Sequence, residues 1–214
     1  MKKVKEQVDL GGRLDAGLEI LGQELGGDTR RKLLEYLALL EKWNRMYSLT
    51  AIRDMTRAVS VHLLDSLAVV PHVRGKRILD VGSGPGLPGI PIALARPEVR
   101  VTLLDSSHKK AAFLRQAVAE LPLKNAEVRC ERIENWQSET RFDCVISRAF
   151  SEISVFVESA AHVLEPSGIL AAMKGVHPYD EIERLPAGFR VRDVIPLQVP
   201  MLNAERHLVL IETA

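Results

Sequence analysis

The sequence predicts an α/β fold in which a doubly wound, mostly parallel sheet follows an N-terminal cap of helices. Up to residue 72, apolar residues recur every three or four positions, which is typical of helices with one buried face. From residue 76 onward, short apolar runs alternate with helical stretches, and this alternation favours parallel strands covered by helices on both faces. The last two apolar runs are separated only by a loop, so the last strand is expected to run antiparallel at the edge of the sheet.

Residues 1–72 are assigned to the helical cap and residues 73–214 to the sheet domain, the two forming one compact unit. The Gly26-Gly27 pair ends the first helical pattern, and Pro71 closes the third. The three cap helices are expected from Arg13 to Leu25, from Asp28 or Thr29 to Asn44, and from Asp54 to Val70.

The sheet domain is expected to contain five alternating strands and then the closing pair. The predicted strands are Lys76 to Val81, Val99 to Asp105, Glu127 to Glu131, Phe142 to Ser147, Ile169 to Met173, Phe189 to Leu197 and Arg206 to Glu212. The helices between them are Gly89 to Ala95, Ser107 to Leu121 and Ile153 to Leu164.

Length and composition fit an ordinary globular chain. The 214 residues, of which 46% are hydrophobic and 27% charged, are enough for one sizeable core. No apolar run reaches the roughly 18 residues that a membrane span needs, and Met1 to Gln7 lead into no signal peptide, so a cytoplasmic protein is expected. The net charge of +1 neither demands nor excludes a nucleic-acid partner. Cys130 and Cys144 are interpreted as reduced core thiols, and no metal-ligand spacing occurs.

The segment from Gly82 to Gly89 follows a predicted strand and opens a helix, so it is the candidate cofactor loop. Glycines such as Gly82, Gly84 and Gly86 let a ligand approach main-chain N–H groups without a Cβ in the way. The loop formally fits the dinucleotide pattern G-x-G-x-x-G, which on its own is a weak signal. Asp80, two positions before the first glycine, instead favours S-adenosylmethionine, because an anion there suits an ammonium group and opposes a pyrophosphate.

Asp105 ends the next predicted strand, where a carboxylate can accept hydrogen bonds from both ribose hydroxyls of the cofactor. A helix-capping role for Asp105 is the alternative. The two spaced acids and the glycines together predict a Rossmann-like sheet of the class I methyltransferase type, with an NAD-dependent oxidoreductase as the alternative from a different class.

With these motifs placed, the sequence resembles the bacterial 16S rRNA guanine-N7 methyltransferases, the family first called glucose-inhibited division protein B. The resemblance extends from about Leu33 to Ile211. It rests on Trp43 to Thr50, His62 to Leu67, Asp80 to Ile92, Leu104 to Ser106, Val145 to Phe150, Lys174-Gly175 and Glu205 to Val209.

The resemblance implies methyl transfer to a guanine of 16S rRNA, with the free rRNA or the small ribosomal subunit as partner and the enzyme acting as a monomer. It places the cofactor against Gly82 and Leu87, against Ile133-Glu134 and against Arg148. Leu87 is expected to supply an apolar wall. Glu134 has an alternative interpretation as a solvated helix-capping acid.

Arg148 follows the apolar run of the fourth strand and is the candidate for holding the cofactor or the base during catalysis. We name no general base, because guanine N7 is a lone-pair acceptor that carries no proton. His62, His162 and His207 are interpreted as core or surface residues.

An RNA-contacting surface is predicted where basic and aromatic residues mix before the sheet domain. Its members are Lys42, Trp43, Arg45, Tyr47, Arg53 and Arg57. For Trp43 and Tyr47, packing of a helix against the sheet domain is an equally weighted interpretation. The sequence also leaves open a methyltransferase that acts on a small molecule or a protein, and a binding protein of the same fold without activity.

Overall fold

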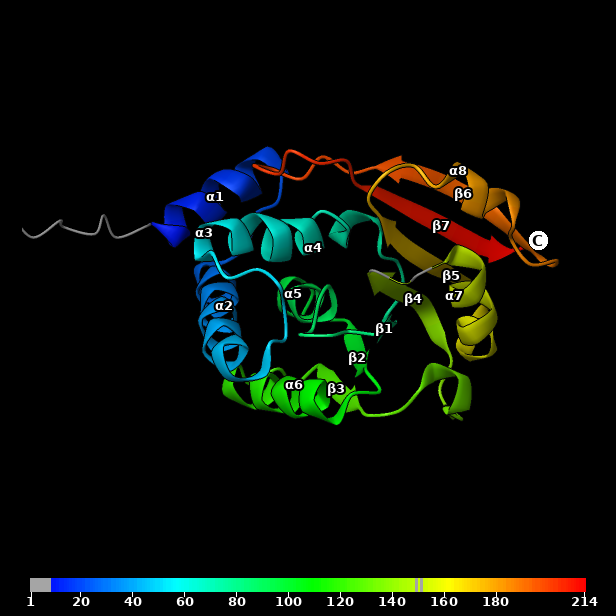
Figure 1. Ribbon diagram of the computed structural model, residues 1–214, viewed down its shortest axis with the longest axis horizontal. Helices are drawn as coiled ribbons and strands as arrows, with labels where there is room; N and C mark the ends of the chain where they lie inside the picture. The colour runs from blue at the N-terminus through cyan, green and yellow to red at the C-terminus, as the bar shows by residue number, and fades with distance from the viewer. Residues whose placement is uncertain (1–8, 149, 151) are drawn as a thin grey trace, which may run out of the picture.

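One seven-stranded sheet organises the protein, in the order β3-β2-β1-β4-β5-β7-β6 (Figure 1). The structure is a computed structural model that describes residues 9–148, 150 and 152–214. Two parts of the sequence discussed above lie outside the described residues. They are the N-terminal segment Met1 to Gln7, and Ala149 within the segment Val145 to Phe150. The strands are β1 Arg77–Val81, β2 Arg100–Leu104, β3 Ala126–Arg129, β4 Phe142–Arg148, β5 Leu164–Lys174, β6 Phe189–Pro196 and β7 His207–Thr213.

The predicted parallel sheet with an antiparallel last strand is confirmed. Strands β1 to β5 pair in parallel, and β7 pairs antiparallel with both β5 and β6. The expectation that the last strand forms the edge is wrong, because β7 lies inside the sheet and β6 forms the edge. Leu208, Val209 and Ile211 of β7 are fully buried, whereas Arg190 and Arg192 keep β6 suited to an exposed edge.

Helices cover the sheet on both faces, as Figure 1 shows. The N-terminal helices gather with α5 and α6, while α7 packs beside β4 and β5. The helices are α1 Leu10–Ile20, α2 Gly27–Tyr47, α3 Met55–Ala58, α4 Asp65–Leu67, α5 Gly89–Ala95, α6 His108–Glu120, α7 Ile153–Ala160 and α8 Tyr179–Glu183. Between α3 and α4 the chain forms a π-helical turn, η1 Val59–Leu64, so these three elements make one continuous helical segment.

The core joins the cap to the sheet domain. Leu14 of α1, Leu33 of α2 and Leu63 of η1 belong to the same buried cluster as Ile78 of β1 and Val101 of β2. A second cluster fills the space between the other face of the sheet and α7. The segment 1–72 therefore packs, in its described part, directly on the elements that carry the predicted site.

Most elements follow the sequence pattern, but some boundaries differ, and α7 for example ends at Ala160 and not at Leu164. Helix α1 ends at Ile20 and not near Leu25, because Gly22 adopts a left-handed conformation (φ 64°) that stops the helix. Strand β5 begins at Leu164, five residues before the predicted start, since exposed residues precede its apolar part. Helix α8 was not predicted from the sequence. Among the described residues, no helix is long and apolar enough to cross a membrane.

Candidate active site

Three neighbouring strands end together at the candidate site. In the order β2-β1-β4, Leu104, Val81 and Arg148 are the last strand residues. The chain order of the sheet reverses between β1 and β4, and open α/β sheets bind ligands at such a switch point. The predicted cofactor residues Asp80, Gly82, Asp105 and Arg148 thus lie together at the carboxyl ends of these three strands.

The glycine loop leaves open space in front of its first two glycines. Gly82 and Gly84 both have positive φ values, of 67° and 60°, which side chains rarely adopt. A Cβ at Gly82 would meet no atom within 4 Å, and one at Gly84 would meet only the carbonyl oxygen of Gly82, at 3.8 Å. A ligand can therefore approach the loop backbone at these positions.

Bonds to strand β2 and from helix α2 hold the loop in this shape. The N–H groups of Gly82 and Ser83 donate to the carbonyl of Leu104, at 2.8 and 3.0 Å. From the cap, the hydroxyl of Tyr36 in α2 donates to the carbonyl of Pro85 at 2.7 Å, and the Tyr36 side chain is fully buried. The cap thus contributes a bond to the cofactor loop itself.

Asp80 lies buried beneath the loop with one carboxylate oxygen available. Its Oδ2 accepts a hydrogen bond from the Gly89 N–H at 2.8 Å, while Oδ1 is buried and has no partner among the described residues. Burial raises the pKa of Asp80 to about 7, although the Gly89 bond and the Arg148 charge act in the opposite direction. A buried carboxylate with a free oxygen is suited to a cationic ligand group, which would supply the missing partner.

Asp105 connects the glycine loop to the start of α6. Its Oδ1 accepts from the Ser107 N–H and its Oδ2 from the Gly84 N–H, both at 2.9 Å. Lys110 Nζ lies 3.5 Å from Oδ2, and Ser107 is the residue that caps α6. Since a carboxylate can accept about four hydrogen bonds, Asp105 keeps capacity for ribose hydroxyls while it connects the glycine loop to α6.

Gly86 and Leu87 face the core more than the ligand side of the loop. A Cβ at Gly86 would meet the side chain of Ile90 at 2.4 Å. The Leu87 side chain is 2% exposed and belongs to the core cluster around α5. Its position therefore does not support the expectation that Leu87 forms an apolar wall for the cofactor.

Ile133 and Glu134 form the short 3₁₀ turn η3, Ile133–Asn135, after β3. Ile133 is buried in the cluster under α7, and Glu134 is exposed. The exposed Glu134 is thus open to solvent a few residues after the end of β3, whereas Ile133 packs into the core beneath the turn.

Arg148, the last residue of β4, lines a cleft. Its Nη1 donates to the carbonyl of Val61 at 3.0 Å and lies 3.3 Å from Oδ2 of Asp65. The cleft has a volume of about 380 Å³ and lies at the carboxyl ends of β4 and β5. It is lined by Val61, His62, Asp65, Arg148, Met173, Lys174, Gly175 and Arg206.

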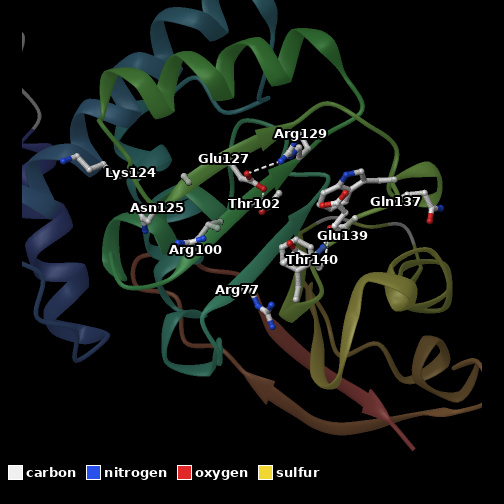
Figure 2. A pocket seen from close by; sticks show the side chains of 15 residues that line it. Arg77, Arg100, Thr102, Lys124, Asn125, Glu127, Arg129, Gln137, Glu139 and Thr140 are labelled. Atoms are coloured by element: carbon white, nitrogen blue, oxygen red, sulfur yellow. Dashed lines mark hydrogen bonds and ion pairs between the residues drawn. The ribbon is translucent and has the colours of Figure 1, made fainter.

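A larger cavity, of about 640 Å³, lies away from this site (Figure 2). Figure 2 shows Thr102, Glu127 and Arg129 along β2 and β3, with Gln137 and Glu139 on the facing loop. Arg77 at its rim forms ion pairs with Asp143 and Glu165, and neither the glycine loop nor the acids beside it line the cavity. Its size alone therefore does not make it the cofactor site.

Three residues of the site had no role assigned from the sequence: Tyr36, Asp65 and Arg206. Asp65 and Arg206 lie within the segments His62 to Leu67 and Glu205 to Val209, which carry the family resemblance. The resemblance did not indicate what either residue does. Tyr36 lies on the apolar face of α2, where its spacing is the same as that of ordinary core residues. Only the fold brings its hydroxyl to the loop.

Several other predicted side chains now have positions. The Trp43 ring packs against Phe113 of α6 with centroids 5.6 Å apart, which supports the packing interpretation of Trp43, while Tyr47 is 40% exposed. His62 is buried as expected, and burial lowers its pKa to about 4. Cys144 is buried, but Cys130 is only half-buried, so its predicted core position is wrong. The described residues include no group of three or more His, Cys, Asp or Glu that could hold a metal ion.

The fold is that of the class I S-adenosylmethionine-dependent methyltransferases. Solved structures with this fold include the glycopeptide N-methyltransferase MtfA in complex with S-adenosylhomocysteine, with a TM-score of 0.59 and 15% identity over 72% of this chain and 87% of that chain. Ribosomal protein L11 methylase from Lactobacillus delbrueckii has a TM-score of 0.54 and 15% identity, covering 70% of this chain and 76% of that one. At such identities the likeness concerns the fold alone.

Sequence relatives identify the family. Residues 29–209 match the family described as rRNA small subunit methyltransferase G. The chain is 54% identical to ribosomal RNA small subunit methyltransferase G of Laribacter hongkongensis, over 92% of this chain and 95% of that protein. It is 55% identical to the protein of the same name from Chromobacterium violaceum, over 92% and 94% of the two chains. The chain belongs to the rRNA small subunit methyltransferase G family.

Proposed function

We propose that the protein transfers the sulfonium methyl group of S-adenosylmethionine to N7 of a guanine in the 16S rRNA of the small ribosomal subunit. The observation that carries the proposal is the cleft that Arg148 lines together with Arg206 and Lys174. Arg148 ends β4, which pairs with β1, the strand that leads into the glycine loop. A ribosomal substrate also supports a cytoplasmic enzyme, which we propose acts as a monomer.

The open space over Gly82 and Gly84 and the free oxygen of Asp80 fit the amino-acid end of S-adenosylmethionine. Asp105 would accept hydrogen bonds from its ribose hydroxyls, and Glu134 lies at the end of β3, where it can face the adenine. Bound there, the cofactor supplies an electrophilic methyl group and a neutral thioether as the leaving group. The protein's own contribution is to hold both reactants in line, and such orientation contributes about 7–11 kcal/mol in favourable cases.

The ionisable groups of the cleft fit an acceptor that has no proton to lose. The carboxylate of Asp65 is held by two guanidinium groups, at 2.8 Å from Arg206 Nε and 3.3 Å from Arg148 Nη1. His62 has a pKa of about 4 and contacts Thr50 Oγ1 through Nε2 at 3.1 Å, so it is a weak base at neutral pH. Methylation of guanine N7 needs no base, whereas methylation of an amine or a hydroxyl does.

RNA structure sets a further condition on the substrate. The major groove of A-form RNA, which carries N7, is too deep and narrow for side chains, so the target guanine must lie in a loop or leave its stack. Near the cleft, a cavity of about 350 Å³ in the cap is lined by residues that include Arg45, Arg53 and His62. Lys42 and Arg57 are also exposed, so the cap presents positive charge beside the cleft.

RNA binding is expected to depend strongly on salt although the net charge is only +1. Contacts between cations and phosphates release counterions, so log affinity should fall linearly and steeply with log salt. Fluorescence anisotropy with a labelled 16S rRNA fragment across a salt series measures the slope. Replacing Arg53 and Arg57 together with glutamine should make the slope shallower, and a flat profile for the parent chain would contradict an RNA substrate.

Binding of S-adenosylhomocysteine, which lacks the sulfonium methyl group but keeps the ammonium group, is expected to strengthen with pH up to about 7. The raised pKa of Asp80 means that the free protein holds a proton there below about pH 7. The ammonium group favours the ionised carboxylate, so binding releases that proton and affinity falls as the pH drops below 7. Calorimetry in buffers of different ionisation enthalpy measures the released proton.

Asp80→Asn is the control for this titration, because it removes the ionisable group and should bind more weakly but with little pH dependence. Pronounced proton release when S-adenosylhomocysteine binds to Asp80→Asn would assign the titration to another group.

The raised pKa of Asp80 also affects the stability of the folded protein, with the opposite pH dependence. An acid whose folded pKa exceeds its unfolded value stabilises the protein at low pH, and this contribution is lost as the pH rises from about 4 to 7.

Tyr36→Phe is expected to weaken S-adenosylhomocysteine binding about fivefold. The change removes only the hydroxyl that donates to Pro85, a bond whose net contribution is about 1 kcal/mol. A loop without this bond must be ordered during binding, which lowers affinity. Calorimetric titration is the measurement, and Tyr179→Phe, at an exposed site, is the control. Unchanged affinity in Tyr36→Phe would show that the cap bond does not order the loop.

The substrate class is tested with tritiated S-adenosylmethionine and isolated small ribosomal subunits from cells that lack this enzyme. Label is expected in 16S rRNA and in no ribosomal protein. Label in protein alone would replace the proposal with a protein methyltransferase. Binding of NADH in preference to S-adenosylhomocysteine would replace it with an oxidoreductase.

A further inference from the structure

Asp65 is a buried carboxylate that joins three distant parts of the chain. It lies at the start of α4 and is 2% exposed. Its Oδ1 lies 2.8 Å from Nε of Arg206, which directly precedes β7, and its Oδ2 lies 3.3 Å from Nη1 of Arg148, the last residue of β4. The two guanidinium groups are 83 and 141 residues away from Asp65 along the chain.

The turn that precedes Asp65 adds a second contact to the same arginine. Residues Val59–Leu64 form a π-helical turn, and the carbonyl of Val61 accepts a hydrogen bond from Arg148 Nη1 at 3.0 Å. π-Helical turns inside α-helices are rare and are found frequently at functional sites. Arg148 is therefore fixed by a carboxylate and a carbonyl that come from one helical segment of the cap.

These contacts lie at the surface of the cleft and not deep in the core. Val61, Asp65, Arg148 and Arg206 all line the cavity of about 380 Å³ at the carboxyl ends of β4 and β5. Arg206 also donates from Nη1 to the carbonyl of Glu205, which fixes its guanidinium on the far side of Asp65. The Asp65 carboxylate thus determines where two walls of the cleft place their positive charge.

We propose that Asp65 is a positioning residue that holds Arg148 and Arg206 in the geometry the acceptor guanine requires. The inference rests on the proposed function and adds residues that act through Arg148. An unpaired guanidinium has many rotamers, and a displacement of about 1 Å can lower a rate by about 100-fold. Asp65 takes part in none of the bonds that hold the glycine loop, Asp80 and Asp105. Its effect through Arg148 should therefore appear mainly in the transfer step and much less in cofactor affinity.

The test is single-turnover methylation of small ribosomal subunits by the full-length chain. Asp65→Asn is expected to lower the rate about 100-fold while the dissociation constant of S-adenosylhomocysteine changes less than threefold. In an Arg148→Ala background, Asp65→Asn should lower the rate by no more than the about tenfold expected for Arg206→Gln, because Arg206 is then the one arginine of the pair that Asp65 still positions. Glu212→Gln is the matched control, since Glu212 also joins two arginines, Arg190 and Arg192, but lies on the β6–β7 hairpin.

Arg206→Gln provides a second variant in case Asp65→Asn does not fold. It leaves Asp65 paired with Arg148 and should lower the rate about tenfold, again without changing cofactor affinity. Rate losses that multiply in the Asp65→Asn, Arg148→Ala double variant, or a parallel loss of cofactor affinity, would overturn the positioning role in favour of a structural one. A parent-like rate in Asp65→Asn or Arg206→Gln would also overturn the positioning role, because the pairing would then have no effect on methyl transfer. A parent chain that does not methylate the subunits would refute the proposed function instead.

Discussion

Replacement of Arg148 with alanine is expected to slow single-turnover methyl transfer by about 100-fold or more, with little change in fold. Arg148 ends β4 at the switch point of the sheet, lines the acceptor cleft and carries a charge that acts on buried Asp80. Without it, neither the base nor the methyl donor is held in register, and the loss should appear in the rate of transfer more than in cofactor affinity.

Arg141→Ala is the matched control for Arg148→Ala. Arg141 directly precedes the opposite end of β4 and also donates to a backbone carbonyl, that of Leu164, at 2.9 Å. It should lower the melting temperature and leave the rate of transfer unchanged. A parent-like rate for Arg148→Ala would remove Arg148 from the reaction.

The pH dependence of the same step distinguishes the acceptor atom. At saturating cofactor, the rate for the parent and for Arg148→Ala should vary little between about pH 6 and 9, since no base has to be deprotonated. Among the carboxylates of the proposed site, Asp80 has a pKa of about 7, which lies within this range. Asp80 acts on cofactor binding, so saturating cofactor removes its effect. A tenfold rise per pH unit would indicate a base and favour an amine or a hydroxyl acceptor.

Replacement of Asp105 with alanine should weaken S-adenosylhomocysteine binding by more than tenfold. Each hydrogen bond from a ribose hydroxyl to a charged acceptor contributes about 1.5–3 kcal/mol, and about 1.4 kcal/mol corresponds to tenfold. The bond from the Gly84 N–H to Oδ2 is lost in the same variant, so the glycine loop also loses one of its supports.

Asp143→Ala is the control that separates a site effect from a general loss of stability. Asp143 also accepts two backbone hydrogen bonds, from Lys76 and Arg77, but near the opposite end of the sheet. Calorimetry should show parent-like affinity for Asp143→Ala and a large loss for Asp105→Ala. Equal affinities for the parent and Asp105→Ala would exclude Asp105 from the cofactor site.

Local chemistry explains which parts of the fold the sequence could predict. The glycine loop and helix α5, Gly89–Ala95, follow from a short apolar strand running into glycines, and the structure confirms both. The position of β7 between β5 and β6 depends on which hairpin strand buries more apolar surface, a comparison that alternation patterns do not make. The start of β5 was hidden because Glu165 and Ser167 interrupt its apolar run.

For the proposed site, too, some residues could be located from the sequence pattern and others only from the folded structure. Asp80 and Asp105 could be predicted because each lies at a fixed distance from the glycines along the chain. The bonds of Tyr36 to Pro85 and of Asp65 to Arg206 span 49 and 141 residues, so only the folded chain brings the partners together. Leu87 illustrates the converse, because a loop residue expected at the ligand is turned into the core.

The identity of the atom that receives the methyl group tests the proposed function most directly. Small ribosomal subunits labelled with tritiated S-adenosylmethionine by this enzyme are digested to nucleosides, which are separated beside authentic methylated standards. We expect the label to co-migrate with 7-methylguanosine from a single position of 16S rRNA. Label in N2-methylguanosine, in a ribose-methylated nucleoside or in a protein would contradict methylation of guanine N7.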